Sequence, residues 1–257
     1  MINPHHLAHW YPTAAYLYVL CLDALSLAWE YLRRNPDYRL DWLRHHNPEP
    51  MAGRWGLRLL EDPALDARDA HPVWLPGHGA VVQLHPDADP PPDAAAFALW
   101  RLPGRKQLIH DGERLVLIVR SPGRCWRFVL AHGVRDGVAV VSAVRAGSTV
   151  SAQSLAADMA RAASSSIVRA RPTPTALLEL HTLQALDATL AGASLREAAE
   201  GLFGADAAAD WHADGGLRSR MRRLVRRGRA LMRGGYRRLA QLAPREKGRF
   251  ETDAKRP

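Results

Sequence analysis

The sequence predicts an α+β protein with an N-terminal helical segment, a central antiparallel β-meander and a C-terminal helical domain of helix-turn-helix type. Three observations predict this class. Apolar residues recur at helical spacing near both ends, turn signals recur roughly every 8–12 residues between short apolar runs in the middle, and the last helical stretch is strongly cationic. With 257 residues, 47% of them hydrophobic, the chain can bury one large core or several smaller ones.

Residues 1–46 are expected to be helical. The pattern favours a helix over Pro12–Arg34, which ends where Pro36 biases the preceding residue away from helical geometry, and a short helix follows. Residues 47–70 contain several Pro and Gly and are expected to form a mostly irregular linker. Three apolar residues before Pro36 are interpreted as a docking face for the C-terminal domain or a partner: Trp29, Tyr31 and Leu32.

Residues 71–147 are expected to form the β-meander. The turn signals "LPGR", "HDGE", "SPGR" and "RDGV" separate the runs "KQLIH", "RLVLIV", "CWRFVLA" and "VAVVSAV". The stretch "RDGV" indicates a two-residue hairpin, because Asp-Gly adopts the backbone angles of such turns. Strands joined by such short turns run antiparallel, which gives the expected topology.

Residues 148–243 are expected to be helical, followed by a disordered polar tail over 244–257. After an Ala-rich, helix-compatible stretch at 151–169, a helix is expected over Thr175–Leu190. Ser194 and Glu197 have the spacing of a capping box, which starts a short helix that ends at Gly204. A long basic helix is expected over Leu217–Leu239. The order fits a helix-turn-helix unit at 175–242, if "DAAADW" adds a helical turn to an otherwise long connection.

The stretch Leu217–Leu239 contains ten arginines and no acidic residue. On a helical projection its apolar residues occupy an arc of roughly 140°, and the arginines fill the rest. Residues 216–257 contain 15 basic and 3 acidic residues, a net +12, whereas the remaining chain contains 20 basic and 23 acidic, a net −3. Such clustering favours nucleic-acid contact. A membrane surface, an acidic protein partner and a bare solvated helix face are the alternatives.

Other function classes find little support in the sequence. There is no phosphate-binding loop, nucleophile elbow or HExxH motif, so we expect no enzyme and no cofactor. The histidines of "HHLAH" at residues 5–9 have no cysteine or carboxylate near them in sequence, so no metal site is expected. The apolar part of the N-terminal stretch, Thr13–Leu22, is too short to span a bilayer. Cys21 and Cys125 suit buried thiols in a reducing compartment, and we expect a cytoplasmic protein without membrane contact.

Both ends of the chain resemble a known family. The stretch "LAWEYLRRNPDYRLDW" resembles the short domain that opens many proteobacterial regulators encoded on integrative and conjugative elements. The stretch "LHTLQALDATLAGASLREAAEGLFG", with "DWHADGGLRSRMRRLVRRGRALMRGGYRRL" after it, resembles the C-terminal domain of the same regulators, which include the frameshifted excision activators of rhizobial symbiosis islands. The resemblance implies an activator of excision and transfer genes that a small antiactivator can inhibit.

The leading hypothesis is therefore a regulator, expected to be an activator, that binds double-stranded DNA and has RNA polymerase or a small antiactivator as candidate protein partners. The alternative is an interaction protein that uses the basic helix without reading DNA. The supporting helix Ser194–Gly204 contributes Ser194 and Arg196 to the expected DNA-binding set. The expected groove-entering residues are Arg218, Arg220, Arg222 and Arg223, and the expected phosphate contacts are Arg226, Arg227, Arg229 and Arg233.

Overall fold

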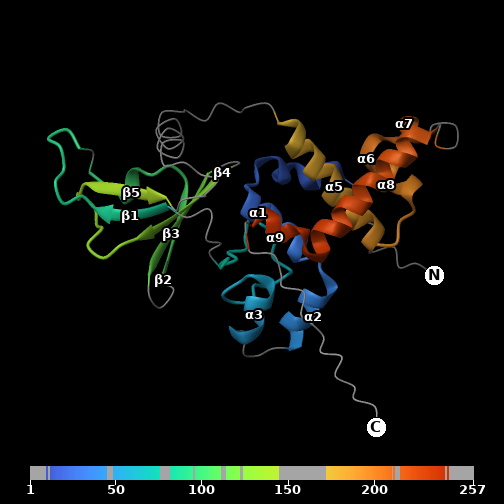
Figure 1. Ribbon diagram of the computed structural model, residues 1–257. Helices are drawn as coiled ribbons and strands as arrows, with labels where there is room; N and C mark the ends of the chain where they lie inside the picture. Colours follow the sequence, from blue (N-terminus) through green and yellow to red (C-terminus); the bar gives the residue numbers. More distant parts are fainter. Residues whose placement is uncertain are drawn as a thin grey trace, which may run out of the picture.

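The computed structural model describes residues 10, 12–44, 49–75, 82–94, 96–110, 114–121, 124–144, 172–209, 211, 215–240 and 242. Helices from both ends of the chain pack together, and a five-stranded sheet lies beside them (Figure 1). The expected α+β class is confirmed. The Ala-rich stretch 151–169, the "HHLAH" histidines and the C-terminal tail lie outside the described residues.

The N-terminal segment forms a 3₁₀ helix, Thr13–Cys21, and the helices α1 (Ala24–Leu32), α2 (Pro36–Arg44) and α3 (Glu49–Trp55). The expected single helix over Pro12–Arg34 is interrupted because Asp23 is the N-cap of α1 and accepts a 2.9 Å hydrogen bond from the Ser26 amide. Cys21 is exposed, so the prediction that it is a buried thiol was wrong.

The sheet has the strand order β2-β3-β4-β1-β5. Its strands are β1 (Val82–Pro86), β2 (Arg105–His110), β3 (Leu115–Ser121), β4 (Arg124–Leu130) and β5 (Val140–Val144). Strands β2, β3 and β4 form the expected antiparallel meander. However, β1 lies between β4 and β5, parallel to β4 and antiparallel to β5.

The sheet is therefore mixed, and the prediction of an entirely antiparallel meander was wrong. The register Val82↔Phe128 places apolar residues of β1 and β4 on one face, where they share a core. Because β1 occupies the position beside β4, the stretch "RDGV" cannot form a hairpin between β4 and β5. It forms a turn in their connection, with a 3.2 Å bond from the Val138 amide to the Arg135 carbonyl.

The C-terminal segment contains α5 (Pro174–Leu190), α6 (Leu195–Phe203), α7 (Ala205–Ala209), α8 (Gly215–Ala230), a π-helical turn (Leu231–Gly235) and α9 (Tyr236–Leu239). Helix α5 packs against both α8 and the N-terminal 3₁₀ helix, and α1 packs against α9. The N-terminal and C-terminal helices, far apart in sequence, are thus close neighbours in space (Figure 1).

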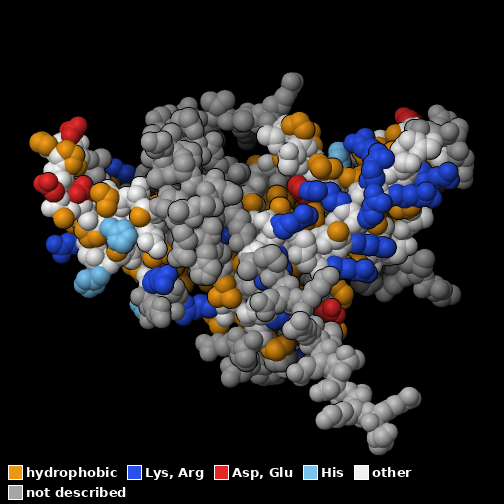
Figure 2. Space-filling view, viewed as in Figure 1, with side chains coloured by type: hydrophobic (Ala, Val, Ile, Leu, Met, Phe, Trp, Pro, Cys, Tyr) orange, Lys and Arg blue, Asp and Glu red, His pale blue; other side chains and the backbone are white. Residues whose placement is uncertain are grey.

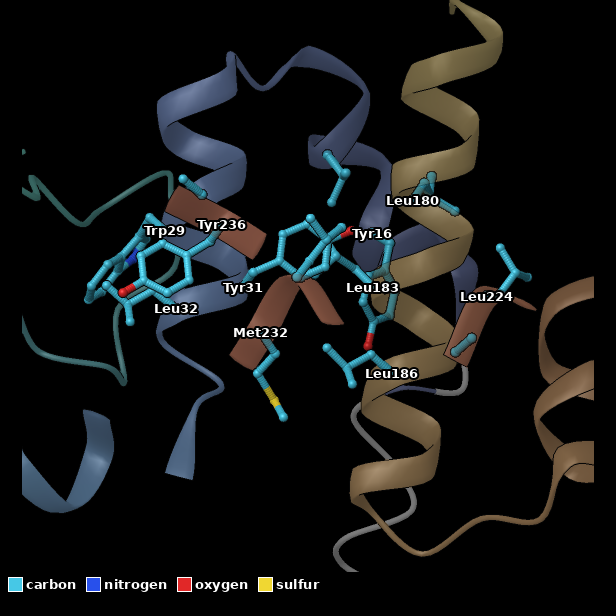
Figure 3. Packing of buried hydrophobic residues seen from close by; sticks show 14 of the residues in the cluster. Tyr16, Trp29, Tyr31, Leu32, Leu180, Leu183, Leu186, Leu224, Met232 and Tyr236 are labelled. Carbon is cyan, nitrogen blue, oxygen red and sulfur yellow. The ribbon is translucent and has the colours of Figure 1, made fainter. Parts of the chain in front are cut away.

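One apolar core joins the two ends. Figure 3 shows Tyr31 of α1 beside Leu183 of α5, with Met232 of the π-helical turn below. The docking face expected at Trp29, Tyr31 and Leu32 is fully buried in this core. Residues from the stretch expected as a linker, 47–70, also contribute to it: Ala52, Trp55, Leu57 and Ala70. The division of the chain into domains stays a prediction.

Candidate nucleic-acid interface

Helix α8 presents a cationic face on an apolar base. Its buried residues are Met221, Leu224, Val225 and Gly228, which fix the orientation of the helix on the core. Most of its arginines point outward, and Figure 2 shows basic side chains gathered over α8 with few acidic ones near them. Within the described part of the chain, seven arginines of α8 and the following turn form no ion pair: Arg218, Arg220, Arg222, Arg223, Arg226, Arg229 and Arg233.

The helices α6, α7 and α8 follow one another in the expected helix-turn-helix order. The capping box is present, because the Glu197 amide donates to Ser194 Oγ at 3.2 Å and the Ser194 amide donates to Glu197 Oε2 at 2.7 Å. The short helix α7, Ala205–Ala209, covers the first four residues of the stretch "DAAADW", as expected for a connection that is too long for a simple turn. Ser194 therefore holds the N-terminus of α6 in place at the start of the unit.

Helices α5 and α8 approach each other closely at Gly228. A Cβ atom there would lie 3.0 Å from Leu186 Cβ and 3.3 Å from the Thr182 carbonyl oxygen. A side chain at this position would force Leu186 or the Thr182 backbone to shift by a few tenths of an ångström, because interiors are close-packed. The short distance between α5 and α8 at Gly228 fixes the position of α8 on the core and hence the positions of its arginines.

An arginine groove lies between the α5–α6 turn and the second half of α8, with a volume of about 720 Å³. One wall is the turn with the first residues of α6, including Ser194. The other wall carries four arginines, Arg222, Arg226, Arg229 and Arg233. Sequence reasoning assigned Arg222 to base contacts, but the structure places it in line with the residues expected to hold phosphates. The turn residues of this groove, Thr189, Gly192 and Ala193, were not in the predicted set, since only the fold brings them opposite α8.

The other predicted residues on α6 and α8 are not among the residues that line this groove. The Arg220 guanidinium stacks over the Phe203 ring at 4.5 Å, and His181 of α5 packs against the same ring at 5.2 Å. Burial, and then the charge of Arg220, lower the pKa of His181, which favours its neutral form. Arg196 pairs with Glu200 one turn later at 3.4 Å and is half exposed.

Arg227 differs from its neighbours on α8. Its guanidinium pairs with Glu179 of α5, whose side chain is 3% exposed, and Tyr31 of α1 donates to the same carboxylate at 2.5 Å. Arg227 thus joins three helices and is not part of the free cationic face. Reversing the charge of Arg227 should therefore destabilise the fold, because the buried Glu179 carboxylate would lose its charged partner.

The basic helix ends earlier than expected. Gly234 has a φ of +148°, which interrupts regular α-helical geometry between α8 and α9. The predicted single helix over Leu217–Leu239 was therefore wrong beyond Ala230. The bend directs Arg237 and Arg238 away from the line of α8 and toward α3, as the lining of a second groove shows.

A buried charge network fixes the N-terminal segment to α5. Arg34 donates to both carboxylate oxygens of Asp187, at 2.6 and 2.7 Å, and it also pairs with the fully buried Glu30. Tyr16 donates to Asp187 at 2.7 Å. Burial alone would raise the pKa of Asp187 and of Glu30, but the charges of Arg34 and Arg33 and the hydrogen bonds to the two carboxylates together outweigh it and hold both pKa values below their ordinary range.

Metal ligation and membrane insertion find no counterpart in the part of the chain that the structure describes. Within these ranges, no three His, Cys, Asp or Glu side chains come together as metal ligands. In the same ranges, no helix has the length and apolar content needed to cross a bilayer.

Comparisons with known families agree with this layout. Residues 142–241 match the family described as "T6SS, Transcription factor, DNA binding domain". Residues 9–59 match the "Proteobacterial transcriptional regulator-like domain", and residues 79–126 match a domain of unknown function, DUF7011. Comparison with curated proteins and with solved structures gave no match. The chain is thus similar at both ends to domains of transcriptional regulators, and its C-terminal similarity spans α5 through α9.

Proposed function

We propose that the chain is a transcriptional regulator that binds double-stranded DNA through α6, α8 and the arginine groove between them. The observation that carries the proposal is the groove itself. Four arginines line it, none of them is ion-paired within the described residues, and the N-terminus of α6 forms the facing wall. The match of residues 142–241 to a DNA-binding domain supports the same conclusion.

The spacing of these arginines fits a continuous polyanion. Arg222, Arg226, Arg229 and Arg233 follow one another at intervals of four, three and four residues, which places them on one face of the helix. They span about 16 Å at a rise of roughly 1.5 Å per residue. Like charges at this spacing repel one another, and a sugar-phosphate backbone along the face would remove that repulsion.

The N-terminus of α6 adds a second attraction for phosphate. The macrodipole, and those first-turn amides that the capping box does not satisfy, favour an anion at a helix start. Ser194 and Leu195 lie in the groove wall opposite the arginines. A phosphate in the groove would therefore meet guanidinium groups on one side and helix-start amides on the other.

Base contacts are assigned to the first half of α8. Recognition helices present their N-terminal residues to the major groove, which on this chain are Arg218, Arg220 and Arg223. Arginine reads guanine by two hydrogen bonds to its major-groove edge. Arg196, half exposed on α6, is assigned to the flanking backbone.

The regulated genes are assigned from the resemblance of both ends of the chain to regulators of mobile elements. We infer an activator of excision and transfer genes, with RNA polymerase or a small antiactivator as protein partner. Relaxase, integrase or conjugation genes beside the coding sequence would support this assignment. Their absence there, with binding sites at unrelated promoters, would remove it.

The test is selection of binding sites from a random duplex pool, followed by affinity measurements on the selected and on a random duplex. Arg226→Gln with Arg229→Gln should weaken both duplexes. The matched control, Arg101→Gln with Arg135→Gln, removes the same charge from exposed positions of the sheet region and should bind as wild type. Equal binding by all three proteins, or no binding at all, would refute the proposal and favour an acidic protein as the partner of α8.

A further inference from the structure

A second groove adjoins the arginine groove at the end of α8. It has a volume of about 460 Å³ and shares Ala230 and Arg233 with the first. The π-helical turn, α9 and α3 form its walls, so it combines the last helices of the chain with a helix from the N-terminal segment. The charged residues among its described lining are all arginines: Arg54, Arg233, Arg237 and Arg238.

The bend at Gly234 creates this groove. With φ at +148°, Gly234 adopts a backbone conformation that side-chain-bearing residues rarely occupy, and a Cβ there would meet open space. A straight continuation of α8 would carry Arg237 and Arg238 onward along its own axis. The bend instead places them beside α3.

Helix α3 is fastened in this position. Tyr236 donates to the Trp55 carbonyl at 3.2 Å, and Arg237 donates to the Arg54 carbonyl at 3.3 Å. The Arg54 guanidinium lies 4.9 Å from the centre of the Trp55 ring and donates to Asp41 at 3.1 Å. These contacts leave Arg54 at the groove wall with its side chain 38% exposed.

We propose that the second groove binds the phosphate backbone of the same duplex, beside the segment that the helix-turn-helix unit reads. The inference rests on the proposed DNA-binding function and extends it to a residue of the N-terminal segment, Arg54. Its basis is continuity with the first groove and charge, because the two grooves share Arg233 and, among the described residues that line them, the charged ones are all arginines. Arg54 is paired with Asp41, which does not line the groove, and its side chain is 38% exposed.

The reach of this second groove along the duplex can be bounded. Ser219, in the first turns of α8, and Arg238 are 19 residues apart, which is about 28 Å along a straight helix. At roughly 3.4 Å per base pair, this corresponds to at most about eight base pairs. The duplex should therefore extend by up to this length beyond the bases read by α8, on one side only.

The experiment uses the full chain and a selected duplex trimmed stepwise from either end. Wild type should lose affinity when the duplex is trimmed, on one side only, to within about eight base pairs of the read bases. The slope of log affinity against log salt should then flatten by about 0.9 for each phosphate that the protein no longer holds. The double variant Arg54→Gln/Arg238→Gln should bind the long duplex with the affinity that wild type has for the trimmed duplex. Trimming the duplex should not lower the affinity of this variant further. Arg238→Gln alone, at an exposed position, should show part of this effect without touching the contacts of Arg54.

The outcomes separate the inference from the function on which it rests. If trimming either side leaves wild-type affinity unchanged, the second groove does not hold the duplex. If the Arg54/Arg238 variant weakens long and trimmed duplexes equally, or neither of them, the inference is likewise overturned. In each case the proposed function stands as long as the Arg226/Arg229 variant binds DNA more weakly than wild type. Loss of the proposed function would show instead as an absence of DNA binding by wild type.

Discussion

Two adjacent arginines of α8 are expected to act on different properties of the protein. Arg226 is exposed and lines the arginine groove, whereas Arg227 pairs with the buried Glu179. Arg226→Gln and Arg227→Gln make the same chemical change one residue apart. We expect the first to weaken DNA binding with little effect on folding, and the second to lower stability.

The size of the binding effect follows from counterion release. If Arg226 holds one phosphate, its replacement flattens the slope of log affinity against log salt by about 0.9. Raising salt fourfold weakens each such phosphate interaction by about 3.5-fold, so the variant should lose about 3.5-fold less affinity than wild type over that range. A surface substitution of this kind changes the free energy of unfolding by no more than about 0.5 kcal/mol.

The size of the stability effect follows from the buried carboxylate. Glu179 is 3% exposed and loses its charged partner when Arg227 is replaced, although Tyr31 still donates to it. Leaving a buried polar group without a partner costs about 1–3 kcal/mol. For a chain of this size, that should lower the melting temperature by about 2–12 °C.

Thermal unfolding and fluorescence anisotropy at several salt concentrations measure the two effects. The single variant Glu179→Gln and the double variant Glu179→Gln/Arg227→Gln complete a double-mutant cycle. The double variant should lose less unfolding free energy than the two single variants together, because it leaves no unpaired charge. If the losses of unfolding free energy in the two single variants add up to the loss in the double variant, the ion pair between Glu179 and Arg227 is refuted. An unchanged salt slope in Arg226→Gln, with the melting temperature of wild type, would remove Arg226 from the DNA interface.

Three further changes test other parts of the same structure. Gly228→Ala should lower the free energy of unfolding by about 1–3 kcal/mol in urea titrations, because the new Cβ meets Leu186 at 3.0 Å. Ser194→Ala should cost about 0.5–2 kcal/mol in thermal melts, whereas Ser194→Asp, which keeps a capping oxygen, should cost less. The lowered pKa of Asp187 means that its ionised form stabilises the fold above its ordinary pKa of 3.8, and this contribution is lost as pH falls below that value. The acid-induced fall in unfolding free energy should flatten in Arg34→Met.

The features that the sequence predicted correctly are local ones. Helical periodicity and the Ser194–Glu197 spacing depend on residues within one or two turns of each other, and both appear in the structure. The same holds for the separation of apolar and cationic faces on α8. A helix of this composition exposes its arginines wherever it docks, so most of the candidate site was visible before the fold.

The features that it missed depend on partners far along the chain. Periodicity placed Arg227 outside the apolar arc but could not show that Glu179, 48 residues earlier, lies beside it. Likewise, β1 pairs in parallel with β4 across more than forty residues, which turn signals between neighbouring strands cannot indicate. Arg54 was missed for the same reason, since its groove forms only when α3 meets α9.

The N-terminal segment is best understood as a structural part of the DNA-binding unit. Arg34 fixes α1 to α5 through Asp187, Tyr31 completes the partners of Glu179, and Asn35 donates to the Met232 carbonyl at 3.0 Å in the turn that follows α8. Removing this segment would expose the apolar side of α5 and take from Asp187 its charged partner. Truncation would therefore abolish DNA binding through unfolding, whatever the segment does in activation. Its regulatory role has to be separated by changes at exposed positions of α2, such as Leu40 and Leu43, which do not contribute to the buried core.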